Sequence, residues 1–171
     1  MKYINDNLLD AFDRGDVKYI AHQCNCFASL YKGKAKGIAG SIMKRYPEAA
    51  EVDGELKEGL SRLGKVAGWH SSGKQGYGYN LYAQYKYGNS AKTGIVYTDY
   101  EALNKCLSDM CDAISLLMVE STVIGIPRIG CGLAGGDWNV VSSILKSVEQ
   151  QCGVEFWVYD LEKVEGTVYS G

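Results

Sequence analysis

The chain has 171 residues, an ordinary apolar fraction and a formal net charge of −2. A chain of this length can bury a sizeable core as one domain. The slightly acidic balance gives no electrostatic footprint for nucleic acid, and no apolar stretch is long enough to cross a bilayer. The first residues lack the charged and apolar regions of a secretion signal, so we expect a cytoplasmic protein.

The first half of the chain alternates strand-like and helix-like segments. A short strand is predicted at Lys2–Ile4 and a buried, β-branched strand at Val17–Cys24. Ile38, Ile42, Met43 and Tyr46 then fall on one helical face, and Pro47 is expected to stop that helix. The pattern next predicts a helix at Glu51–Leu63 and strands at Lys65–Trp69 and Tyr77–Gln84.

The second half continues the alternation. The longest helix is predicted over Tyr100–Val119, and a strand is expected at each of Thr122–Ile126 and Glu155–Asp160, with a helix over Asn139–Gln150 between them. This pattern predicts an α/β three-layer α/β/α sandwich. We expect one domain over residues 1–160 and a poorly ordered tail over 161–171. The residues expected to face the sheet are Leu103, Leu107, Met110, Ile114 and Leu117 in the first helix and Val140, Ile144, Leu145 and Val148 in the second.

The segment Ile126–Trp138, IPRIGCGLAGGDW, carries the most chemical information. An apolar strand runs into a glycine-rich loop, and Asp137 has the position of a helix N-cap. Free backbone N–H groups at such a turn form a cradle for anionic oxygens, and glycine lets the main chain approach a phosphate closely. Glycines also make ordinary tight turns, so the loop alone does not decide the function.

Polar side chains also gather where the second predicted strand ends, at His22, Gln23 and Asn25. The six cysteines of a chain without a secretion signal are expected to be reduced. His22, Cys24 and Cys26 do not have the spacing of a closed zinc site, so we expect no metal and no cofactor.

These motifs resemble those of macrodomains. The resemblance rests on AHQCNC with a following glycine-containing helix that ends in RYP, NLYAQ in the middle, YEAL at a helix start and IPRIGCGLAGGDW. It is nearest to the ADP-ribose-1″-phosphate phosphatases, a branch that also holds terminal ADP-ribose protein glycohydrolases. The resemblance implies a mixed sheet between helices and ADP-ribose as the ligand. We expect the protein to act as a monomer, without nucleic acid or membrane.

The resemblance also implies roles for individual residues. Asn25 would bind the distal ribose, the loop 33–38 would pack against that ribose and its phosphate, and the loop 130–136 would cradle the diphosphate. The adenine-binding Gly-Asp pair of the family corresponds here to Asp6–Asn7, so Asn7 or Asp6 would hold the base. The substrate-binding residues expected in this way are Asn7, Leu8, Asn25, Ala35, Lys36, Gly37, Ile38, Gln84, Ile129, Gly130, Cys131, Gly132, Leu133, Ala134, Gly135 and Gly136. Whether the aromatic-rich span 77–100 adds a stacking wall for adenine stays open.

The expected reaction is hydrolysis of the terminal phosphate of ADP-ribose-1″-phosphate, with His22 as general acid–base. The glycohydrolase relatives use a lysine and an aspartate where this chain has Gln84 and Ala134, and neither side chain can do that chemistry. A thiol nucleophile at Cys131 is a rival to His22. A binding module that reads ADP-ribose, or a de-ADP-ribosylating hydrolase, is the alternative function. A Rossmann-type NAD enzyme is disfavoured because no Gly-x-Gly-x-x-Gly follows the first strand.

Overall fold

The computed structural model describes residues 1–27, 33, 35–73, 76–117 and 122–161. The predicted tail therefore lies outside the described residues except for Leu161, and so does residue Lys34 of the predicted binding loop 33–38. None of the described helices is long and apolar enough to span a membrane.

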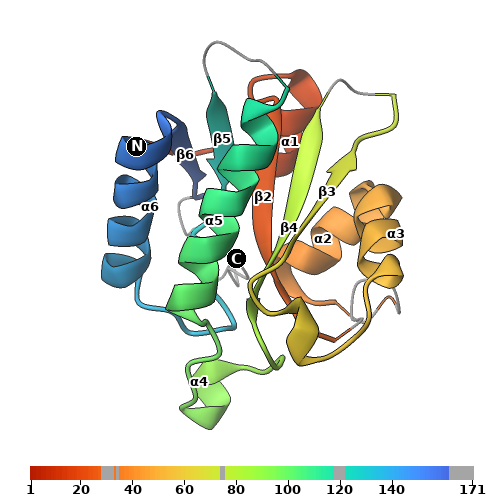
Figure 1. The fold of residues 1–171 in the computed structure, drawn as a ribbon, viewed down its shortest axis with the longest axis vertical. Helices are drawn as coiled ribbons and strands as arrows, with labels where there is room; N and C mark the ends of the chain where they lie inside the picture. The colour runs from red at the N-terminus through yellow and green to blue at the C-terminus, as the bar shows by residue number, and fades with distance from the viewer. Residues whose placement is uncertain (28–32, 34, 74–75, 118–121, 162–171) are drawn as a thin grey trace.

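One six-stranded sheet forms the centre of the molecule (Figure 1). Every neighbouring pair of strands is parallel except the last pair, which is antiparallel and joined by a turn. The predicted mixed sheet is therefore confirmed. The strands, in spatial order, are β1 (Lys2–Ile4), β6 (Glu155–Tyr159), β5 (Val123–Ile126), β2 (Tyr19–Asn25), β4 (Tyr77–Gln84) and β3 (Val66–His70).

Helices cover both faces of this sheet, which confirms the three-layer prediction (Figure 1). One face packs against α5 and α6, and the other against α1, α2 and α3. A 3₁₀ turn, η1, and a single-turn helix, α4, lie in the connections. The bounds are α1 (Leu8–Arg14), α2 (Gly37–Arg45), α3 (Pro47–Glu55), η1 (Leu60–Arg62), α4 (Ser90–Thr93), α5 (Tyr100–Ser115) and α6 (Trp138–Cys152).

The apolar stripes of the two long helices are close to those predicted. In α5, the four predicted positions from Leu103 to Ile114 are buried, but Leu117 lies beyond the helix end and is largely exposed. In α6, Val141 is buried in place of the predicted Val140. Asp137 caps α6 as expected, since its side chain accepts a hydrogen bond from the N–H of Asn139.

The predicted helix at 51–63 is wrong in its extent. Helix α2 ends at Arg45, before Pro47 as predicted, and Pro47 then starts α3, where a missing N–H costs nothing. Helix α3 ends at Glu55, and Leu56 is extended. The buried guanidinium of Arg62 accounts for this end, since it donates hydrogen bonds to the carbonyl oxygens of Leu56 and Lys57, which a longer helix would use internally.

Candidate ligand-binding cavity

A cavity of about 590 Å³ opens where β2 and β4 end and where the loop after β5 begins. This is the edge of a parallel sheet at which ligands usually bind, because the strands leave and their connecting loops diverge there. Most of the predicted binding residues meet in its lining. Those that do are Asn25, Ala35, Lys36, Gly37, Ile38, Gln84, Ile129, Gly130, Gly132, Leu133 and Ala134.

The N-terminus of α2 forms one wall of the cavity. Lys36 precedes the helix without a side-chain cap, and the first N–H groups of a helix have no acceptor within it. Gly37 starts the helix with a φ of 63°, a conformation that favours glycine. Gly40 allows the preceding loop to cross the helix closely, because a Cβ there would lie 2.6 Å from the carbonyl oxygen of Ala35. The wall therefore presents backbone donors and the positive end of a helix dipole.

The glycine-rich loop after β5 forms the opposite wall. Its ends are closed by a hydrogen bond from the N–H of Gly136 to the carbonyl of Gly130, 2.8 Å long. A Cβ on Gly136 would lie 2.4 Å from that same carbonyl oxygen, so only glycine fits. Among the described residues, the N–H groups of Gly132, Leu133 and Ala134 donate to no backbone carbonyl. These three residues line the cavity and can serve as donors to an anion.

A buried polar network fixes the start of this loop. The hydroxyl of Thr98 donates to the carbonyl of Gly130 at 2.6 Å. Gln23 donates through Nε2 to both Thr98 Oγ1 and Gln84 Oε1, each at 3.0 Å. Gly130 has a φ of 74°, and a Cβ there would lie 2.9 Å from Gln23 Oε1. The network therefore holds the loop against the end of β2.

Helix α4 braces the loop from outside. The N–H of Ser90 donates to the carbonyl of Leu133 and that of Tyr97 to the carbonyl of Ala134, both at 2.8 Å. Sequence reasoning did not find this element, although Asn89 and Gly94 are typical cap residues and do cap the helix. A trans peptide places its N–H opposite its carbonyl, so the hydrogen bond from Ser90 to the carbonyl of Leu133 directs the N–H of Ala134 away from α4.

His22 does not line the cavity. Its side chain is 1% exposed on the sheet face covered by α3, where its Nε2 lies 2.7 Å from Asn80 Oδ1. Burial lowers the pKa of His22 to about 4, against a smaller opposing effect of the Asn80 hydrogen bond. The predicted acid–base role therefore needs correction, because the ring of His22 is buried deeper along β2, where Asn80 holds it, and does not reach the cavity.

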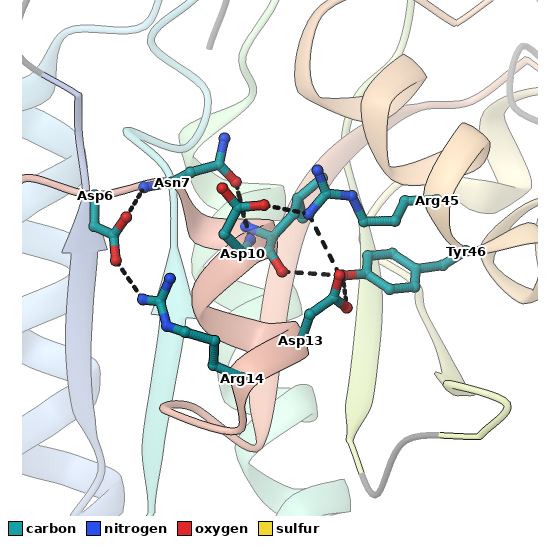
Figure 2. Close-up of polar contacts among 8 residues, drawn as sticks. Asp6, Asn7, Asp10, Asp13, Arg14, Arg45 and Tyr46 are labelled. Carbon is teal, nitrogen blue, oxygen red and sulfur yellow. Dashed lines mark hydrogen bonds and ion pairs between the residues drawn. The ribbon is translucent and has the colours of Figure 1, made fainter.

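Asn7 and Leu8 also lie outside the cavity lining. The side-chain oxygen of Asn7 caps α1 by accepting from the N–H groups of Leu9 and Asp10, and Asp6 pairs with Arg14 (Figure 2). Leu8 is 4% exposed in the core. Asp6, Asn7 and Leu8 thus have structural partners, and this cavity gives no support to the adenine role predicted for Asp6 or Asn7 or to the binding role predicted for Leu8.

The remaining predicted residues of the loop do not line the cavity. Cys131 packs against the core between the sheet and α5, and burial raises the pKa of its thiol to about 11. A nucleophile must be a thiolate near neutral pH, so Cys131 does not suit that role. Gly135 turns away against Ser90. None of the six cysteines is joined in a disulfide in the structure.

Two carboxylates that the sequence analysis did not single out also line the cavity, Asp53 and Glu58. Asp53 is buried and accepts hydrogen bonds from the Tyr82 hydroxyl at 2.6 Å and from Arg62 Nη1 at 3.0 Å. Glu58 is exposed in the segment between α3 and η1. Neither could be predicted from a motif: Asp53 lies in the last turn of α3, and Glu58 follows the helix end that Arg62 determines.

No protein-family model matches the sequence. An uncharacterized protein of the tk-vs intergenic region of Enterobacteria phage T4 is 28% identical over 95% of this chain and 97% of its own. A protein of unknown function from Bacteroides thetaiotaomicron has a similar structure, with 25% identity, a TM-score of 0.75 and coverage of 94% and 97% of the two chains.

Two further solved structures define the fold class. The macrodomain of Mycobacterium tuberculosis DarG superimposes with a TM-score of 0.70 at 22% identity, covering 94% of this chain and 97% of its own. Thermosipho africanus DarTG in complex with ADP-ribose gives a TM-score of 0.66 at 16% identity, covering 88% of this chain and 40% of its own. The chain therefore has the macrodomain fold, and the resemblance found in the sequence is confirmed at that level.

Proposed function

We propose that this protein binds ADP-ribose in the cavity between α2 and the glycine-rich loop, and that it hydrolyses ADP-ribose-1″-phosphate. The binding part rests on one observation above all: two sets of backbone N–H donors, at the start of α2 and at 132–134, line the same cavity. Main-chain donors of this kind suit phosphate oxygens. The similar structure of Thermosipho africanus DarTG holds ADP-ribose, which supports this choice of ligand.

In this proposal the loop 130–134 cradles the diphosphate. Asn25 binds the distal ribose with its carboxamide, whose oxygen also accepts from the N–H of Phe27 at 2.9 Å. The start of α2 and Lys36 receive the terminal phosphate, since a helix N-terminus and an ammonium group both stabilise negative charge. We also propose that the protein acts as a monomer in the cytoplasm.

For the hydrolytic step we assign Glu58 the role first predicted for His22. A water oxygen attacks phosphorus while the bond between phosphorus and the oxygen on ribose C1″ breaks. One water proton passes to the Glu58 carboxylate and from there to the leaving oxygen, and the other stays on the phosphate. The backbone donors and Lys36 spread the developing charge.

A lysine-dependent glycohydrolase reaction has little support. Gln84 lines the cavity at the position where the glycohydrolase relatives have a lysine. Its side-chain amide donates to the carbonyl of Lys86, and its side-chain oxygen accepts from Gln23. Ala134 also lines the cavity and cannot move a proton. A reader of ADP-ribose without catalysis needs only the two sets of donors and is the alternative.

Phosphate release from ADP-ribose-1″-phosphate tests the proposal, with isothermal titration of ADP-ribose on the same sample. We expect Glu58→Gln to lose about 100-fold or more in turnover with ADP-ribose affinity kept, because loss of a general base costs that much. His22→Gln is the matched control and should stay within about threefold of wild type. If the protein binds ADP-ribose but releases no phosphate, the phosphatase activity is overturned and the non-catalytic reader is supported. If Glu58→Gln turns over the substrate as fast as wild type, Glu58 is not the general base.

A further inference from the structure

Two large side chains of the glycine-rich segment have no part in the binding proposed above. Arg128 precedes the loop 130–136 and Trp138 follows it, and neither residue lines the cavity. The guanidinium of Arg128 lies over the indole ring of Trp138, with its central carbon 5.0 Å from the ring centroid. This contact, the Arg128–Trp138 stack, joins the two ends of the loop outside the cavity.

The stack is anchored to the ends of β1 and β6. The same guanidinium lies over the ring of Tyr3 in β1, 5.5 Å from its centroid, and Trp138 Nε1 donates to the Tyr3 hydroxyl at 3.2 Å. Arg128 Nε donates to the carboxylate of Asp160, which follows β6 directly. The N–H of Asp160 donates to the carbonyl of Ile4, at the end of β1, at 2.9 Å. Both ends of the loop are thus tied to one part of the sheet.

The backbone of Arg128 also fixes the first peptide of the loop. The N–H of Cys131 donates to the carbonyl of Arg128 at 3.1 Å. A trans peptide places its carbonyl opposite its N–H, so this hydrogen bond turns the carbonyl of Gly130 the other way. That carbonyl accepts from the N–H of Gly136 and closes the loop. The placement of Arg128 therefore bears on the orientation of the donors at 132–134, which follow directly.

We propose that Arg128 is a positioning residue for the ligand and that it acts through its stack on Trp138. The inference rests on the proposed ADP-ribose binding and names a residue that this binding needs outside the cavity. Four of the seven loop residues are glycine, so the loop backbone alone has many conformations open to it. The stack holds the loop ends at one spacing and so favours the binding conformation. Without the stack, the apparent affinity falls with the populated fraction of that conformation.

Isothermal titration of ADP-ribose with Arg128→Met tests this inference. We expect binding about tenfold weaker than in wild type, because the cation–π contacts and the ion pair that hold the loop ends are lost. Lys2→Met is the matched control, since the Lys2 ammonium lies 4.9 Å over the ring of Trp157 on the same two strands and neither residue lines the cavity. Its affinity should stay within about twofold of wild type.

The ¹H–¹⁵N amide signals of the ligand-free protein give a second readout, which a merely stabilising contact would leave in place. Arg128→Met and Trp138→Leu should each shift the signals of residues 132–134, and Lys2→Met should not. The double variant should bind ADP-ribose within about twofold of the weaker single variant, because both changes remove the same stack. If Arg128→Met does not fold, Trp138→Leu carries the same prediction for affinity and for the amide signals.

Three results would overturn the positioning role of Arg128. They are an affinity of Arg128→Met within about twofold of wild type, additive losses in the double variant, and a loss that disappears in about 1 M NaCl. The last would mean that Arg128 acts by its charge, which salt screens. If wild type does not bind ADP-ribose, the proposed function fails, and the amide signals of the ligand-free variants still decide whether Arg128 holds the loop.

Discussion

His22 and Asn80 share a buried hydrogen bond of 2.7 Å between β2 and β4. Asn80 Oδ1 also accepts from Trp69 Nε1 at 3.1 Å, and its amide donates to the carbonyl of Ala49. The oxygen is therefore the acceptor for both rings, which places the proton of neutral His22 on Nε2. This network joins β2, β3, β4 and α3, so His22 contributes to the fold and is kept neutral.

The free energy of unfolding should decrease at acidic pH, because the buried side chain of His22 is neutral in the folded protein. Its pKa is lowered from 6.5 to about 4 by burial, so the unfolded chain binds more protons between these values and stability rises with pH there. The contribution of neutral His22 to the free energy of unfolding is present above pH 6.5 and is lost as the pH falls toward 4. Between pH 8 and pH 5 the loss is roughly 2 kcal/mol. Denaturant unfolding at both pH values should show this difference in wild type and a smaller one in His22→Gln. Equal differences would contradict the assignment.

Arg62→Met should be strongly destabilising. Arg62 and Asp53 are each 1% exposed, so removing the guanidinium leaves a buried carboxylate and several carbonyls without their donor. We expect a loss of about 3–5 kcal/mol in the free energy of unfolding. Arg14→Met is the control, because its ion pairs are exposed and should contribute about 0–1 kcal/mol. Similar losses in the two variants would refute the special role of the buried pair.

Gly130→Ala should weaken ligand binding. The added methyl group would meet Gln23 Oε1 at 2.9 Å and Thr98 Oγ1 at 3.0 Å, so the loop would have to move off the end of β2. Gly153→Ala has nearly the same φ, 69° against 74°, with nothing within 4 Å of the new methyl. Both variants should lose about 1 kcal/mol of stability for the left-handed backbone. Only Gly130→Ala should also bind ADP-ribose about tenfold more weakly or worse by isothermal titration; unchanged affinity would argue against the loop as the cradle.

Asp137→Ala should cost about 1 kcal/mol of stability, because it removes the cap of α6. Asp137→Asn keeps a side-chain oxygen and should retain most of it. Thermal or denaturant unfolding of the two variants measures the difference. A loss of equal size in Asp137→Asn would mean that charge, and not the cap hydrogen bond, is what α6 requires.

Much of the fold follows from local sequence patterns. The stripe of α5 follows from helical periodicity because one face of the helix is buried, whereas β2 and β4 are buried on both faces and are marked by continuous apolar runs. The end of α3 was missed because it depends on Arg62, a residue beyond the helix whose side chain returns to cap it. Such a tertiary contact leaves no periodic signal. Helix α4 was missed because one turn is too short to show periodicity.

The lining of the candidate cavity was predictable where local glycine and helix-start patterns form it. The glycine-rich loop and the start of α2 line the cavity as expected, since glycine and helix-start patterns are local. The roles of His22, Asn7 and Leu8 depend on which way a side chain points and on the partners it meets from other elements. His22 is hydrogen-bonded to Asn80, and Asn7 accepts hydrogen bonds from N–H groups of α1. No local pattern in the sequence indicates either partner.

The amide ¹H–¹⁵N spectrum of the protein during titration with ADP-ribose tests the central claim most directly. The account predicts saturable shifts for the amides of Gly132, Leu133 and Ala134 and for those at the start of α2, because these groups would donate to the ligand phosphates. Spectra without saturable shifts, or with shifts confined to residues outside the cavity lining, would contradict it.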